Sequence, residues 1–283
     1  KFKFKIMATT QKAASPTKKN QGFQGIRAAI WVIVVCFVIA LCIFKYLLGN
    51  PANFAGNDPA GHPTNLLGTI YKGGVIVPII QTLLLTVIAL SIERWIALRS
   101  AFGTGSLAKF VLNVKAAVSK GDFAEAQRIC DKQRGSVANV VSASIRAYKE
   151  MEATAGMKKA QKVSKIQQAH EEATQLEMPT LQMNLPIIAT IVTLGTLTGL
   201  LGTVIGMIRS FQALAAGGGG DSLALSTGIS EALINTAFGI LTSWVAVISY
   251  NTFTNKIDKL TYALDEVGYS IAQTYEANHA DEA

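Results

Sequence analysis

Residues 186–208 read PIIATIVTLGTLTGLLGTVIGMI, and residues 228–250 read GISEALINTAFGILTSWVAVISY. Each stretch is apolar over the roughly 20 residues that an α-helix needs to cross a bilayer. Each also carries glycine, serine, threonine or asparagine side chains along one helical face. Together they predict two neighbouring membrane helices whose facing sides are small and polar.

The rest of the chain supports a membrane protein. Of its 283 residues, 50% are hydrophobic and only 16% are charged, whereas soluble domains carry about 25% charged residues. Residues 26–48 and 73–98 are two further apolar stretches of membrane-spanning length. A cleaved signal peptide is the alternative for residues 26–48, but the stretch is too long for one, so we expect a retained helix. This composition excludes a soluble enzyme.

The cysteines argue against a disulfide-stabilised secreted scaffold. Cys36, Cys42 and Cys130 are odd in number and form no C-x-x-C pair. We expect all three to be free thiols.

The placement of basic residues predicts the topology. Lysine and arginine are concentrated before residue 28 and between residues 99 and 185, and they are almost absent from residues 50–72 and 210–227. This asymmetry follows the positive-inside rule and does not resemble a nucleic-acid-binding stripe. It predicts an even number of spans with both termini in the cytoplasm. Residues 1–6 precede Met7, which we take as the natural start, and are left out of fold reasoning.

The predicted segments follow in chain order. They are a basic cytoplasmic tail (1–25), an additional first membrane helix (26–48), a periplasmic loop (49–72), a second membrane helix (73–98), a cytoplasmic helical domain (99–185), a third membrane helix (186–209), a second periplasmic loop (210–227), a fourth membrane helix (228–250) and a cytoplasmic helical extension (251–283).

Helix signals continue outside the membrane. Asp122 with Glu125 three residues later predicts a capped helix start. Residues 157–178 predict a polar helix that runs on into the third span. Apolar residues after the fourth span recur at alternating intervals of three and four, which predicts that its helix continues with a packed seam. These residues are Ile257, Leu260, Leu264, Val267 and Ile271.

The third and fourth spans carry the candidate functional residues. Small-xxx-small patterns bring membrane helices into close contact, and here they are formed by Gly195, Gly199, Gly202, Gly206 and Gly239. Polar side chains follow the same faces, and we expect Thr196, Thr203, Glu231, Asn235, Thr236 and Ser243 to line a proton pathway. Thr203 and Thr236 fall at similar depth. Alternatively, these hydroxyls bond only to their own helix and the glycines serve packing alone.

Several kinds of chemistry are not supported. No Walker loop or G-x-S-x-G elbow occurs, and the glycine run at 217–220 is better explained as a flexible loop. The histidines His62, His170 and His279 are scattered, so we expect no metal site, no cofactor and no enzymatic activity. No ionisable side chain lies at mid-depth in any span, so a proton path would need an acid from a partner subunit.

Several motifs resemble the ExbB/TolQ branch of the MotA/TolQ/ExbB proton-channel family. They are LGTLTGLLGTVIGMIRSFQAL (194–214), ISEALINTAFGI (229–240), YNTFTNKID (250–258), SIERWIALR (91–99) and GDFAEA (121–126). The resemblance covers about residues 73–275. It implies pore threonines at Thr203 and Thr236 and a functional glutamate at Glu231. The first helix is an addition, because ExbB and TolQ have three spans. The proline-marked pore pattern of four-span MotA is not seen.

The resemblance also implies an assembly and a function. The expected fold is an all-α integral membrane protein of the bacterial inner membrane, a homopentamer around a central pore that encloses a dimer of ExbD/TolR-like single-span subunits. The expected function is a stator that uses the proton-motive force to energise a TonB-like protein for outer-membrane nutrient import. A TolQ-like role, a gliding or secretion motor, a self-sufficient ion channel or transporter, and a packing scaffold are the alternatives.

Overall fold

The computed structural model describes residues 29–59, 61–216 and 222–279. The predicted basic tail, the first residues of the first span and the glycine run at 217–220 lie outside these ranges. In the described residues the chain is built from helices, and four of them are long and apolar enough to cross a membrane. The prediction of an all-helical protein with four membrane helices is therefore confirmed.

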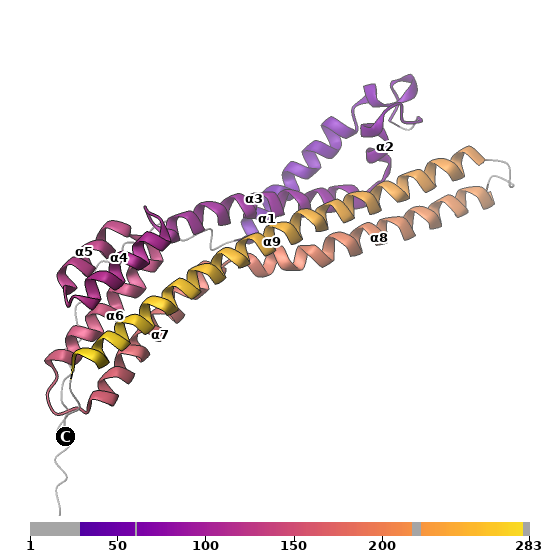
Figure 1. The fold of residues 1–283 in the computed structure, drawn as a ribbon. Helices are drawn as coiled ribbons and strands as arrows, with labels where there is room; N and C mark the ends of the chain where they lie inside the picture. The colour runs from indigo at the N-terminus through magenta and orange to yellow at the C-terminus, as the bar shows by residue number, and fades with distance from the viewer. Residues whose placement is uncertain (1–28, 60, 217–221, 280–283) are drawn as a thin grey trace, which may run out of the picture.

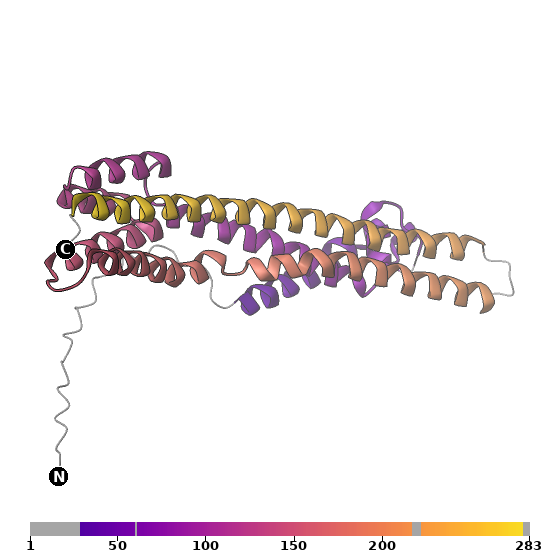
Figure 2. The same ribbon diagram turned by 60° about the horizontal axis from the view of Figure 1, so that its bottom comes forward.

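Three of the four long helices run side by side along the molecule, and the first is inclined to them (Figure 1). The first is α1 (Ala29–Cys42), which continues as a π-helical turn over Ile43–Leu48, and it packs beside α3 (Ile76–Phe102). The other two, α8 (Leu185–Ala216) and α9 (Ser222–Asn278), make the most extensive helix pair in the described chain. Helix α9 runs unbroken from one end of the molecule to the other (Figure 2), as the sequence predicted for the fourth span.

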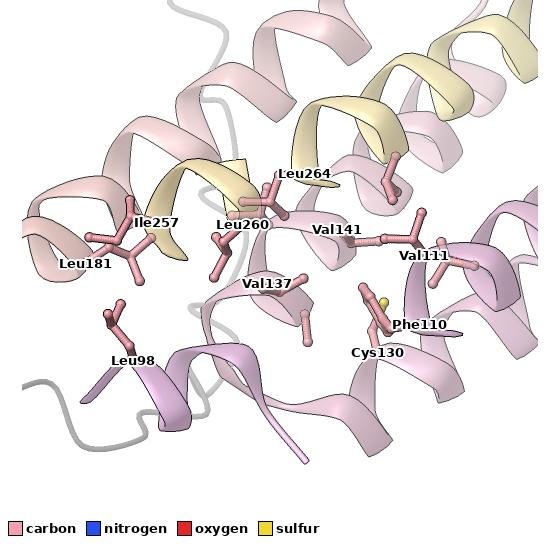
Figure 3. Packing of buried hydrophobic residues seen from close by; sticks show 14 of the residues in the cluster. Leu98, Phe110, Val111, Cys130, Val137, Val141, Leu181, Ile257, Leu260 and Leu264 are labelled. Carbon is pink, nitrogen blue, oxygen red and sulfur yellow. The ribbon is translucent and has the colours of Figure 1, made fainter. Parts of the chain in front are cut away.

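A helical head occupies one end of the molecule. It consists of α4 (Leu107–Ser119), α5 (Phe123–Gln133), α6 (Gly135–Ala153), α7 (Lys159–Gln182) and the C-terminal part of α9. The predicted seam of α9 is confirmed, because its five apolar side chains from Ile257 to Ile271 are at most 2% exposed. They pack against residues such as Val137, Val141 and Leu181 (Figure 3). As predicted, Asp122 caps α5 by accepting a hydrogen bond from the Glu125 backbone N–H.

The polar helix before the third span does not run into it. Helix α7 ends at Gln182 and α8 begins at Leu185, so the prediction of one continuous helix is wrong. Asn184 between them has φ +64°, which is a left-handed conformation. Pro186 follows in the first turn of α8, where a residue without a backbone N–H is tolerated. These two residues end one helix and start the next.

The predicted loop 49–72 contains ordered structure. Residues 49–59 and 61–74, which we name the cap, hold two short 3₁₀ turns (Pro51–Asn53 and Ala55–Asn57) and helix α2 (Leu66–Lys72). The Asn53 side chain donates hydrogen bonds to the carbonyl oxygens of Leu47 and Leu48 at 2.9 and 3.0 Å. The sequence predicts only a loop here, because short turns that are held by side-chain amides do not produce a periodic pattern of hydrophobic residues.

Candidate functional site

The seam between α8 and α9 is built on glycine. A Cβ atom added at Gly239 would lie 2.6 Å from the Gly195 carbonyl oxygen and 2.7 Å from the Gly199 Cα atom. Both contacts are to backbone atoms, which cannot rotate away. One added at Gly202 would lie 2.6 Å from the Asn235 Cβ atom. The backbones therefore approach too closely for side chains at these positions, as small-residue patterns allow in membrane helices.

Hydroxyl side chains form rungs across this seam. The hydroxyls of Thr203 and Thr236 contact each other, and the Thr196 Oγ1 atom lies 2.8 Å from the Ser243 Oγ atom. The two rungs are seven residues apart on both helices, which is about two helical turns. Because α8 and α9 are antiparallel, Thr196 meets Ser243 and Thr203 meets Thr236. The predicted common level of Thr203 and Thr236 thus corresponds to a direct contact.

A third rung was not predicted. Ser210 follows Thr203 by seven residues, is 3% exposed, and lies against Gly228 of α9. Its hydroxyl donates to the Gly206 carbonyl oxygen at 2.8 Å. The seven-residue repeat Thr196, Thr203, Ser210 is the signal that could have revealed it.

At the central rung, the hydroxyls of Thr203 and Thr236 have more hydrogen-bond acceptors within reach than they have protons to donate. The Thr203 hydroxyl lies 3.3 Å from the Ala232 carbonyl oxygen and 3.4 Å from that of Gly199, and the Thr236 hydroxyl lies 3.2 Å from the Gly199 carbonyl oxygen. Each hydroxyl carries one proton and two acceptor lone pairs, so the pair can exchange donor and acceptor roles. Such a pair can relay or orient a proton but cannot store one. Its role as pore lining stays a prediction.

Asn235 and Glu231 lie toward the cap end of α9. Asn235 is 3% exposed, and its Nδ2 atom donates to the Gly73 carbonyl oxygen at 3.1 Å. This bond ties α9 to the cap of the same chain. Glu231, one turn before it, is half-buried and borders a cavity of about 450 Å³. The two side chains thus face elements of their own subunit.

A buried ion pair lies at the other end of α3. The Arg94 Nε and Nη2 atoms donate to the two Glu93 carboxylate oxygens at 2.6 and 2.5 Å, and Arg94 Nη1 donates to the Thr180 carbonyl oxygen at 3.2 Å. The Asn184 side chain donates to Glu93 Oε2 at 3.2 Å. Arg94 is fully buried and Glu93 is 5% exposed. The pair ties α3 to the junction of α7 and α8.

No group of three or more potential metal ligands occurs among the described residues. The chemistry of the seam is therefore that of hydroxyls, one amide and one carboxylate.

Part of the amino-acid sequence is similar to known proteins. Residues 137–266 match the sequence model of the MotA/TolQ/ExbB proton channel family. The chain is 28% identical over 191 residues to the Tol-Pal system protein TolQ of Pseudomonas aeruginosa, a match covering 64% of this chain and 81% of that protein. It is 36% identical over 81 residues to the biopolymer transport protein ExbB of Helicobacter pylori, covering 29% and 56%. Residues 137–266, just under half of the chain, are thus similar to this family, and the named relatives support its ExbB/TolQ branch.

A third relative, the ExbB-like 3 protein of Synechocystis, is 37% identical over 87 residues, and that match covers 30% of this chain and 41% of the relative. All six predicted polar residues and all five glycines lie within the region matched to the ExbB/TolQ family model. The cap, α1 and the Glu93–Arg94 pair lie before it. The sequence alone did not indicate the buried ion pair, because adjacent opposite charges near the end of an apolar stretch are also expected where a helix leaves the membrane.

Proposed function

We propose that this protein is a proton-channel subunit of an inner-membrane complex that converts the proton-motive force into mechanical work. The observation that carries the proposal is the Thr203–Thr236 hydroxyl contact inside the family-matched region. Hydroxyls at membrane depth are costly unless they meet other polar groups or water. A packing role alone would need only the glycines.

The proposed assembly is a homopentamer around a dimer of ExbD/TolR-like single-span subunits. It is supported by the absence of an ionisable residue at mid-depth in the four predicted spans. A proton crossing a bilayer needs a titratable group near its middle, and here a partner would supply that acid. The proposed topology places both termini and the helical head in the cytoplasm and the cap outside, as the distribution of basic residues favours.

The proposed client is a TonB-like protein. A Tol-Pal role is the second candidate, and it is favoured by the match to TolQ of Pseudomonas aeruginosa, which covers 81% of that relative. Deleting the gene in its host distinguishes them. Loss of energised outer-membrane uptake supports the TonB-type role, whereas leakage of periplasmic protein with intact uptake supports the Tol-Pal role.

The channel proposal is tested by removing the hydroxyls. The double variant Thr203→Val and Thr236→Val keeps side-chain volume and should abolish proton-driven work. The double variant Thr203→Ser and Thr236→Ser is the matched control, because it keeps both hydroxyls and should retain activity. Both should assemble with the single-span partner, as judged by co-purification. Full activity of the valine variant would favour the packing scaffold.

A second experiment separates a subunit from a self-sufficient channel. The purified chain is reconstituted alone into vesicles carrying a pH-sensitive dye, and proton flux is measured after a potential is imposed. We expect flux at the level of empty vesicles. Rapid flux from the chain alone would overturn the proposed need for a partner acid.

A further inference from the structure

The cap is fastened to the side of α9, short of the tip of the α8–α9 pair (Figure 1). The Asn65 side chain donates to the Asn53 Oδ1 atom at 2.9 Å. The Tyr71 ring stacks on Phe44 with centroids 4.7 Å apart and meets Phe54 edge to face at 5.5 Å. Ile70 of α2 packs in a cluster that includes Ile234 and Phe238 of α9. The cap therefore has a fixed position over α9.

A cavity lies where the cap meets α3, α8 and α9. Its volume of about 450 Å³ is more than an order of magnitude above the roughly 10–15 Å³ that one water molecule needs. Its polar wall is contributed by three parts of the chain: His62 and Lys72 come from the cap, Arg209 and Ser210 from α8, and Thr227 and Glu231 from α9. A cavity with this many polar groups is suited to water.

The cavity extends along the α8–α9 seam as far as Gly202 and Asn235, the chain neighbours of Thr203 and Thr236. The two threonines themselves do not line it. Although Asn235 is 3% exposed, its Oδ1 atom has no hydrogen-bond partner within the protein. A buried amide oxygen is normally paired, and ordered water is the common partner where protein donors are missing. Because Asn235 lines the cavity, this atom marks a hydration site in its wall.

Two cations act on the carboxylate in the wall. Lys72 and Arg209 are the side chains whose positive charge acts on Glu231. They belong to separate elements, the end of α2 and the end of α8. Fixed positive charges beside a water-filled path raise its electrostatic barrier to every cation, the proton included, and the Glu231 carboxylate offsets part of that charge. The cavity thus combines a water-filled interior with a positive field.

We propose that this cavity is a water-filled access route inside each subunit, by which the transported proton reaches Glu231 from the cap side, with Lys72 and Arg209 setting the positive potential of its wall. The route rests on the proposed function. The proton leaves a hydronium ion, which remains as water, and forms an O–H bond on the Glu231 carboxylate. The cap, which precedes the family-matched region, becomes a working part of the subunit.

Cysteine labelling tests the access route without requiring transport. Cys36, Cys42 and Cys130 are first replaced by alanine in the full chain, co-expressed with its partner, and Ile205→Cys is then introduced into the cavity wall. Leu90→Cys, which is fully buried, and Ile240→Cys, which is 41% exposed on an apolar face, are the matched controls. The membrane-impermeant anionic reagent MTSES is added to spheroplasts, and modification is followed by a gel shift.

We expect Ile205→Cys to react about tenfold faster than either control, because thiolates form and react in water. Thr227→Cys at the same wall is the second reporter if Ile205→Cys does not accumulate. Equal rates at cavity and control positions would overturn the route. Because this readout needs no transport, labelling with inactive transport would refute the proposed function while leaving the route standing.

The charge of the cavity is tested by comparing two reagents. Anionic MTSES should modify Ile205→Cys faster than the cationic reagent MTSET, after correction for their rates with a free thiol. In the double variant Lys72→Gln with Arg209→Gln, the negative charge of Glu231 is no longer balanced by these two cations. The cationic reagent should then react faster than the anionic one, with a change of about tenfold in the ratio of the two rates. Lys115→Gln, on the exposed surface of the helical head, is the control and should leave the ratio unchanged. An unchanged ratio in the double variant would overturn the assignment of Lys72 and Arg209.

Discussion

The two halves of α9 pack by opposite rules. Toward the C-terminus, branched apolar side chains such as Leu260 and Leu264 are at most 1% exposed and fill the helical head. Toward the N-terminus, the buried positions are Asn235, Gly239 and Ser243, which pack against glycines of α8. In water a helix is held by burying apolar area, whereas in lipid close backbone contact and hydrogen bonds take over. One continuous helix therefore combines a stable anchor with a polar, close-packed seam.

The largest expected effect is at the close-packed seam. Gly239→Leu would place side-chain atoms against backbone atoms of Gly195 and Gly199, so it should destabilise the α8–α9 pair by more than about 3 kcal/mol. Ala237→Leu, on the exposed side of α9, is the control and should be tolerated. Thermal unfolding in detergent measures both. Similar melting temperatures for the two variants would show that the seam is loose.

The next largest effect is expected at the buried Glu93–Arg94 pair, which ties α3 to the junction of α7 and α8. Arg94→Leu would leave the Glu93 carboxylate buried without its partner, which costs about 3–5 kcal/mol. Arg99→Leu removes an exposed arginine of the same helix and should have little effect. The double variant Glu93→Gln with Arg94→Leu should recover part of the loss because no unpaired charge remains. If Arg94→Leu matches the Arg99→Leu control in a denaturation assay, the pair does not hold the junction.

Leu260→Ala probes the apolar half. Removing a fully buried leucine should lower the free energy of unfolding by about 2–5 kcal/mol. Tyr262→Ala, at a position that is 75% exposed, should change it by less than about 0.5 kcal/mol. Denaturation followed by circular dichroism measures both. A neutral Leu260→Ala variant would contradict the view that this half is the stabilising one.

The smallest effect is an expected lack of reaction in the apolar half. Burial raises the pKa of the Cys130 thiol to about 12, with the nearby Asp131 charge adding to the rise. Only the thiolate reacts with maleimides, and well below this pKa the group is almost entirely the neutral thiol. Cys130 should therefore stay unlabelled at pH 8 in the folded protein and react after denaturation in SDS. Rapid labelling of the folded protein would show that water enters the helical head.

The sequence predicted features that depend on periodicity. The four spans, the seam from Ile257 to Ile271 and the close approach at Gly199 all follow from spacing along a regular helix. Features that depend on single side chains in irregular backbone were missed. The left-handed Asn184, the cap held by Asn53 and the partners of Arg94 arise from contacts between residues distant in the chain.

For the candidate site, the sequence predicted the facing rungs but not every neighbour. Thr203 and Thr236 could be placed at one level because both lie on regular helices of known rise. The contact of Asn235 with Gly73 could not be predicted, because it depends on how the cap folds over α9.

The break at Asn184 and the continuity of α9 together have a mechanical consequence. A helix of 57 residues with a rise of 1.5 Å per residue is about 85 Å long, so a tilt at its bilayer end displaces its opposite tip like a lever arm. The antiparallel path beside α9 is broken at Asn184, where α7 ends and α8 begins. A rotation of the membrane part of α9 is therefore transmitted along that single helix, whereas α7 and α8 change their relative angle at Asn184.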